Sequence, residues 1–215
     1  MKRLLSIVAA LAVACTSAFA DSSYFLIQGA FGPSGEITTH KWRIDYEPGA
    51  DPLTGADLLN AVFGNPTNTG TARHGYPLYT AGDASMSISY LDHGWGVSVD
   101  SILLNGIEIF AGPVFGDPYW NYFVAGGSGL FQPSGYASGV WNESQEGFST
   151  RYLTDGSFDG WVWGEWGVTL DSFPLESYFA DATIIAIPEP GSIALALIGL
   201  SGIWVLQRRK CQTRL

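Results

Sequence analysis

The chain has 215 residues, with 27 glycines, eight tryptophans and a formal net charge of −10. Nineteen acidic residues and only four basic ones lie between Asp21 and Asp181, so this segment carries a net charge of −15. Such acidity argues against nucleic acid or anionic lipid as a partner, and the solubility of an exported protein explains most of it. Cys15 and Cys211 lie outside the segment, which excludes a disulfide or a reactive thiolate within it.

Residues 1–20 have the pattern of a secretory signal peptide. The basic start Met1–Arg3 precedes an apolar run from Leu4 to Cys15, and Ala18–Ala20 provides an A-x-A cleavage site. We therefore expect a signal helix that signal peptidase removes during export across the inner membrane. A lipoprotein alternative, in which Cys15 is lipidated, is disfavoured because the residues directly before it do not match the leucine-initiated recognition motif of lipoproteins.

Residues 21–186 are predicted to form one β-rich domain, because glycine is dense and long helical periodicity is absent. The β-prone run Tyr24–Ile27 predicts a first strand. Thr38–Tyr46 predicts a second, in which apolar residues alternate with charged ones.

One short helix is predicted over residues 54–64. Thr54 provides an N-cap, Asp57 stands three residues later, and Gly64 ends the helix. An apolar face is formed by Leu58, Leu59 and Val62. Residues 65–82, rich in Gly, Pro and Thr, are predicted to be a loop.

Strands are then expected over Ser85–Tyr90, Gly96–Leu104 and Ile107–Phe110. The pair Asn105-Gly106 separates the last two and is a strong signal for a tight hairpin.

An aromatic-rich half follows, with strands predicted at Tyr119–Val124, Phe148–Leu153 and Trp161–Trp166. The dipeptides Asp155-Gly156 and Asp159-Gly160 predict tight turns.

No catalytic or metal-binding residue is predicted. His40, His74 and His93 lack metal-ligand spacing, and no G-x-S-x-G motif occurs. Carboxylates three or four residues apart near turns are usually solvated or capping, which is how we interpret Glu143 with Glu146 and Asp155 with Asp159. The sequence therefore does not indicate an enzyme.

Aromatic side chains are the candidates for ligand binding: Trp120, Tyr122, Trp141, Trp161 and Trp163. Trp161 and Trp163 are expected on one face of a strand, with Trp166 on the other. A flat aromatic face can stack on a sugar ring or a macrocycle. The alternative is that these rings fill a core that is poor in aliphatic residues.

The C-terminal segment combines Pro188-Glu189-Pro190, an apolar run over Ile193–Leu206 and the basic cluster Arg208–Lys210. The prolines favour an extended, accessible backbone, and a membrane crossing takes roughly 20 mostly apolar residues. The segment 187–210 resembles a PEP-CTERM sorting signal, with residues 211–215 as a cytoplasmic tail. A plain membrane anchor is the alternative.

The resemblance to PEP-CTERM proteins implies several partners and a location. An exosortase-type transpeptidase would process the chain at the motif, after a C-terminal transmembrane helix has held the precursor in the membrane. The product would reach the cell surface or the medium of a bacterium that makes exopolysaccharide.

A second resemblance covers residues 41–166. It is carried by Gly55–Val62, Val99–Ile107, Tyr119–Gly127 and Leu153–Gly156, which look like the C-terminal domain of transcobalamin-type proteins. It implies a compact α+β, mostly β domain with a β-grasp-like antiparallel sheet and one short helix.

In the transcobalamin family this domain covers one face of a corrinoid, which makes a corrinoid the one cofactor to consider. The chain departs from the family pattern at Ala125, where Asn is usual, at Ser157, where Asp is usual, and in the long insert Ser128–Glu146.

Two classes of function remain. The first is an exported, non-catalytic surface or matrix protein that binds a saccharide or corrinoid through its aromatic residues. The second is a structural envelope or biofilm component without a small ligand. A secreted hydrolase is a distant third.

Overall fold

The computed structural model describes residues 21–47, 52–71, 75–93, 97–112, 117–144, 146–165, 168–170 and 174–187. The predicted signal helix, the motif Pro188-Glu189-Pro190 with its apolar tail, and Trp166 lie outside the described residues. Within the described ranges, no helix is long and apolar enough to cross a membrane.

A six-stranded sheet forms the main body of the domain, with the strand order β10-β8-β12-β1-β2-β13. The central strands β1 and β12 are parallel, as are the edge strand β13 and its neighbour β2, while the remaining pairs are antiparallel. The strands are β1 (Asp21–Gly29), β2 (Thr38–Tyr46), β8 (Tyr119–Ala125), β10 (Asn142–Glu143), β12 (Ser157–Gly164) and β13 (Thr183–Ile187).

The helix α2 (Gly55–Phe63) follows β2, as the sequence predicts. The backbone N–H of Thr54 donates to Asp57 Oδ2 at 2.8 Å, and the N–H of Gly64 donates to the carbonyl of Asn60 at 2.8 Å. The apolar face of α2, formed by Leu58, Leu59 and Val62, is buried as expected.

A second sheet is an antiparallel meander of five strands. They are β3 (Thr67–Thr71), β4 (Pro77–Gly82), β5 (Ser87–Asp92), β6 (Val97–Leu104) and β7 (Ile107–Phe110). The predicted hairpin is confirmed: Asn105 and Gly106 join β6 to β7 with φ values of 54° and 76°.

The predicted loop over residues 65–82 is wrong, because it contains β3 and β4. Their local pattern is weak, but β5 pairs with β4 from Ser87 to Leu91, and Ala81 of β4 is only 2 % exposed. Pairing with a neighbour strand thus overrides the local propensity of a Gly- and Thr-rich segment.

Two other local predictions are corrected. Asp159-Gly160 is not a turn: it lies within β12, where Asp159 is opposite Phe25 of β1 and Val124 of β8. The turn at Asp155-Gly156 is confirmed, with Gly156 at φ 70°.

The strand predicted over Phe148–Leu153 is instead a 3₁₀ turn, η2 (Phe148–Thr150). It is followed by the two-residue β11 (Arg151–Tyr152), which pairs with β9 (Ser128–Gly129).

Apolar side chains cover both faces of the main sheet. On one face, Phe25, Ile27 and Trp161 belong to a core shared with α2 and the meander. On the other, Leu26 and Phe158 pack with Phe179 of the 3₁₀ turn η3 (Glu176–Phe179). The predicted class, mostly β with one short helix, is confirmed, and the sheet is antiparallel except for its two parallel pairs.

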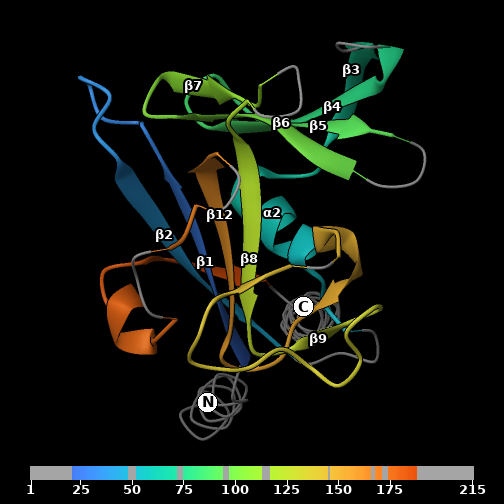
Figure 1. Ribbon diagram of the computed structural model, residues 1–215, viewed down its shortest axis with the longest axis vertical. Helices are drawn as coiled ribbons and strands as arrows, with labels where there is room; N and C mark the ends of the chain where they lie inside the picture. The colour runs from blue at the N-terminus through green and yellow to red at the C-terminus, as the bar shows by residue number, and fades with distance from the viewer. Residues whose placement is uncertain are drawn as a thin grey trace, which may run out of the picture.

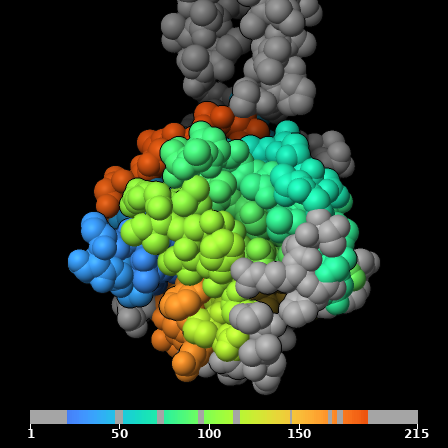
Figure 2. Space-filling view, turned by 90° about the horizontal axis from the view of Figure 1, so that it is seen from above, coloured from blue at the N-terminus to red at the C-terminus, as the bar shows by residue number. Residues whose placement is uncertain are grey.

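The two sheets meet at an angle. Figure 1 shows the meander across one end of the long strands, with α2 beneath it and against the main sheet. Viewed from above in Figure 2, the meander in green covers much of this end of the molecule.

Candidate functional site

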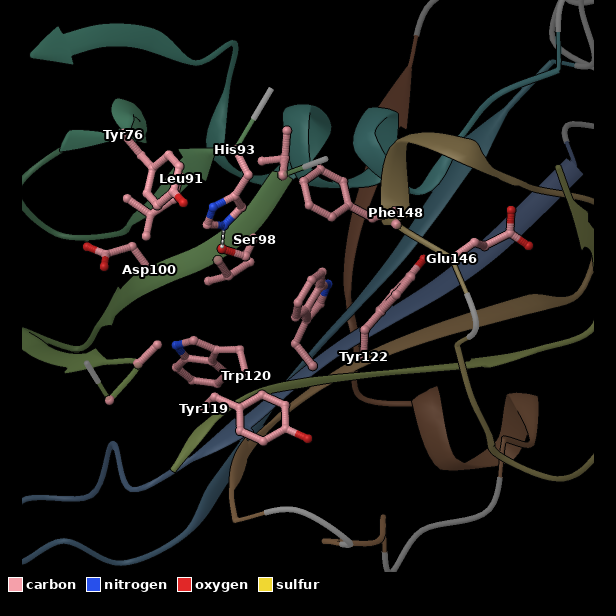
Figure 3. Close-up of a pocket in the computed structure, with 16 residues that line it drawn as sticks. Tyr76, Leu91, His93, Ser98, Asp100, Tyr119, Trp120, Tyr122, Glu146 and Phe148 are labelled. Atoms are coloured by element: carbon pink, nitrogen blue, oxygen red, sulfur yellow. Dashed lines mark hydrogen bonds between the residues drawn. The ribbon is translucent and has the colours of Figure 1, made fainter. Parts of the chain in front are cut away.

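A cavity of about 470 Å³ lies between the meander and the main sheet. Figure 3 shows Leu91, His93 and Asp100 on its meander side, and Trp120 and Tyr122 on the opposite side. Residues that precede or begin η2, among them Phe148, form a third side. The cavity thus draws on segments that lie far apart in the sequence.

The strands β8 and β12 place four of the five predicted aromatic residues side by side. Tyr122 is opposite Trp161, and Trp120 is opposite Trp163. Because alternate residues of a strand point to the same face, the four rings share one face of the sheet. The expectation that Trp161 and Trp163 lie on one face agrees with this arrangement.

Three of these rings line the cavity: Trp120, Tyr122 and Trp161. The rings of Tyr122 and Trp161 are stacked, with centroids 4.6 Å apart and an interplanar angle of 20°. Trp120 stacks on Phe31 at 6.0 Å. Its Nε1 is buried and has no hydrogen-bond partner among the described residues. Because the protein itself shields this N–H, a ligand in the cavity would meet the ring of Trp120 and not its donor.

The other two predicted residues lie outside the cavity lining. Trp163 donates a hydrogen bond from Nε1 to the carbonyl of Phe110 at 3.3 Å, which ties β12 to the end of β7. Trp141 packs edge-on against Phe158 at 6.4 Å, on the opposite face of the main sheet.

A buried ionic cluster supports the cavity wall. Arg151 and Asp159 are 0 % and 1 % exposed, and Nη2 of Arg151 lies 3.3 Å from Oδ1 of Asp159. Tyr122 donates its hydroxyl to Oδ2 of the same carboxylate at 2.5 Å. The guanidinium also donates to the carbonyls of Gly126 and Tyr152, at 2.6 Å each.

Burial dominates the electrostatics of this cluster. It raises the pKa of the Asp159 carboxyl, and attraction to Arg151 opposes that rise only in part. Burial, followed by the charge of Asp159, holds the pKa of the Tyr122 hydroxyl well above its usual range. Tyr122 therefore stays neutral and keeps donating to Asp159, which fixes its ring against Trp161.

This cluster is not predicted from the sequence. The Asp159-Gly160 pattern indicates a solvated turn, and no motif singles out Arg151. One signal was available: Asp159 is flanked by Phe158, Trp161 and Val162, which are strand-forming residues, and Arg151 is one of only four basic residues in the acidic segment.

Two buried carboxylates lie at opposite edges of the cavity lining. Asp100 and Glu146 are 7 % and 8 % exposed, and Figure 3 shows their carboxylates pointing outward, away from the space between Trp120 and Phe148. Tyr136 donates to Oε1 of Glu146 at 2.8 Å. The interpretation of Glu146 as solvated is therefore wrong, because its buried carboxylate accepts hydrogen bonds from the Tyr136 hydroxyl and the Phe131 N–H. No lysine or arginine occurs among the described residues of the lining.

The histidines do not come together. His93 lines the cavity, where Nε2 lies 2.8 Å from Ser98 Oγ, whereas His40 stacks on Trp42 in another part of the core. His74 lies outside the described residues. Among the residues the structure describes, no three His, Cys, Asp or Glu side chains are grouped so that they could hold a metal ion.

Comparison of the chain with protein-family models, with curated proteins and with solved structures gave no match.

Proposed function

We propose that residues 21–187 form a non-catalytic domain that binds a saccharide in the cavity between the meander and the main sheet. The observation that carries this proposal is the wall made by Trp120, Tyr122 and Trp161. The C–H face of a sugar ring packs on aromatic rings, and its hydroxyls form hydrogen bonds with polar side chains of the lining such as Ser98. A volume of about 470 Å³ falls within the range of small-molecule sites, about 300–1,000 Å³.

The charges favour a ligand without acidic groups. An anionic sugar would be buried beside two carboxylates, with no lysine or arginine among the described lining residues to pair with it. A buried charge without a partner is costly. Neutral sugars avoid this penalty, because their hydroxyls both donate and accept hydrogen bonds.

A corrinoid is the second candidate, and the topology of the core favours it. The order β2-β1-β12-β8, with parallel central strands and α2 directly after the first hairpin, is the arrangement expected of a β-grasp-like core. It supports the proposed relation to the C-terminal domain of transcobalamin-type proteins, with the meander inserted between α2 and β8. Cobalamin therefore belongs in the same binding test.

We further propose that the chain is exported and processed at a PEP-CTERM signal, with an exosortase-type transpeptidase as partner. The support is the sequence pattern, together with the end of β13 at Ile187, directly before Pro188. The sorting motif thus follows the last strand with no intervening residue.

Intact-mass analysis of the protein from its native host tests the export proposal. We expect the mature product to begin at Asp21 and to lack residues 193–215. A product that retains the apolar tail contradicts processing and supports a plain membrane anchor.

Titration of residues 21–187 with glycans tests the binding proposal. The panel holds cellotriose and mannotriose as neutral sugars, trigalacturonate as an acidic one, and cobalamin. We expect saturable binding of a neutral sugar. Trp120→Phe should weaken it about tenfold, equivalent to about 1.4 kcal/mol, because the smaller ring packs on less of the sugar.

Trp163→Phe is the matched control, since it makes the same change on the same face of the sheet but outside the cavity. It should alter the affinity less than twofold, and thermal unfolding of both variants checks the fold. Equal losses of sugar affinity in the two variants would show that the sugar binds outside the cavity. Absence of binding across the panel would favour the structural alternative, whereas binding of cobalamin alone would favour the transcobalamin-like one.

A further inference from the structure

A second cavity, of about 260 Å³, adjoins the first one. Val97 and Phe148 line both, so these two side chains form the boundary between the cavities. Val97 is 38 % exposed although it is apolar. The boundary is therefore reached from solvent.

The second cavity has the same chemical character as the first. Tyr79 and Tyr90 provide aromatic surface, and Asn60 and Asp92 provide polar groups. As in the first cavity, the lining contains no lysine or arginine among the described residues. An amide and a carboxylate beside aromatic rings again suit a neutral sugar, which packs one face and donates its hydroxyls.

A continuous row of aromatic rings connects the two cavities. Tyr90 lies 5.5 Å from Phe148, and Phe148 meets Trp161 edge-on at 5.6 Å. Trp161 then stacks on Tyr122. The row runs from the meander, through η2, to the main sheet. None of its members is charged where it passes the boundary between the cavities.

From this geometry we propose that the ligand is a neutral, unbranched oligosaccharide that occupies both cavities and crosses the boundary at Val97 and Phe148. One part of the chain packs on Trp120 and Trp161, and the next lies against Tyr79 and Tyr90, where Asn60 contacts its hydroxyls. This inference rests on the proposed function, and it specifies the ligand as a chain rather than a single sugar.

A chain-length series tests the proposal. Glucose and the β-1,4-linked glucose oligomers from cellobiose to cellohexaose are titrated against residues 21–187, and the mannose series is run in parallel. We expect affinity to rise with length until both cavities are filled and then to level off, with a total gain of at least tenfold over the shortest sugar that binds.

Asn60→Ala separates the two cavities. Alanine is a better helix former than asparagine, so α2 is expected to remain folded. The variant should weaken binding of the longest oligomers three- to tenfold and leave the shortest binding sugar unaffected, whereas Trp120→Phe should weaken both.

Each result has a distinct meaning. Affinity that does not change with length overturns the two-cavity proposal and leaves the saccharide site intact. A gain with length that Asn60→Ala does not reduce also overturns it, because the extra units then lie elsewhere. Failure of every oligomer to bind contradicts the proposed function itself.

Discussion

A single buried carboxylate, Asp159, links the interior of the main sheet to the wall of the cavity. It pairs with Arg151 and accepts the Tyr122 hydroxyl, and so it fixes the ring that stacks on Trp161. Removing one partner of a buried ion pair typically costs about 3–5 kcal/mol, because the other charge is left uncompensated. At the scale of residues, the position of Tyr122 therefore depends on two groups that do not line the cavity.

Gly55, the first residue of α2, makes this dependence testable. A Cβ at this position would lie 2.6 Å from the Tyr122 hydroxyl and 2.8 Å from the carbonyl oxygen of Phe148. Gly55→Ala should therefore push α2 away from the cluster and lower the free energy of unfolding by about 1–3 kcal/mol, the usual cost of overpacking. Denaturant unfolding measures the change.

Gly147→Ala is the control for this substitution. Gly147 has φ −70°, a value that any residue adopts, and a Cβ there would meet only Ser149 Oγ, at 3.9 Å. Its unfolding free energy should stay within about 0.5 kcal/mol of the parent, as for an unstrained substitution. Equal stability of Gly55→Ala and the parent would show that the cluster tolerates displacement.

At the scale of elements, the sequence predicts the structure correctly where residues close together in the chain set the local geometry. Asn105-Gly106 takes up the positive φ values of a hairpin turn, and Thr54 with Asp57 starts α2. In both places the interacting residues lie within three positions of each other. Such features can be predicted from the sequence because no distant partner is needed.

Local signals failed where a distant strand supplied the partner. Asp159-Gly160 is a turn dipeptide, yet it lies in β12 because β1 and β8 pair with that strand on both sides. Residues 65–82 likewise form β3 and β4 because β5 pairs with β4. The turn propensity of a dipeptide is outweighed by two ladders of backbone hydrogen bonds.

At the scale of the whole molecule, the cavities exist because the meander crosses the end of the main sheet. Lining residues range from Tyr76 to Trp161 in the sequence, so no local pattern reveals them. Residue type did identify the aromatic candidates. Type alone could not separate Trp120 and Trp161, which line the cavity, from Trp163 and Trp141, which pack elsewhere.

An NMR titration of the tryptophan side chains shows directly whether a sugar binds in the cavity. Residues 21–187 are labelled with ¹⁵N, and each indole N–H signal is assigned through Trp→Phe variants. A neutral glucose or mannose oligosaccharide is then added. Each side chain gives one signal, so the spectrum locates the ligand without disturbing the fold.

We expect the indole signals of Trp120 and Trp161 to shift in a saturable way. Both rings line the cavity, so a bound sugar changes the surroundings of their indoles. The signals of Trp163 and Trp141 should stay in place. Shifts confined to Trp141 or Trp163, or no shift at saturating sugar, would contradict sugar binding in the cavity.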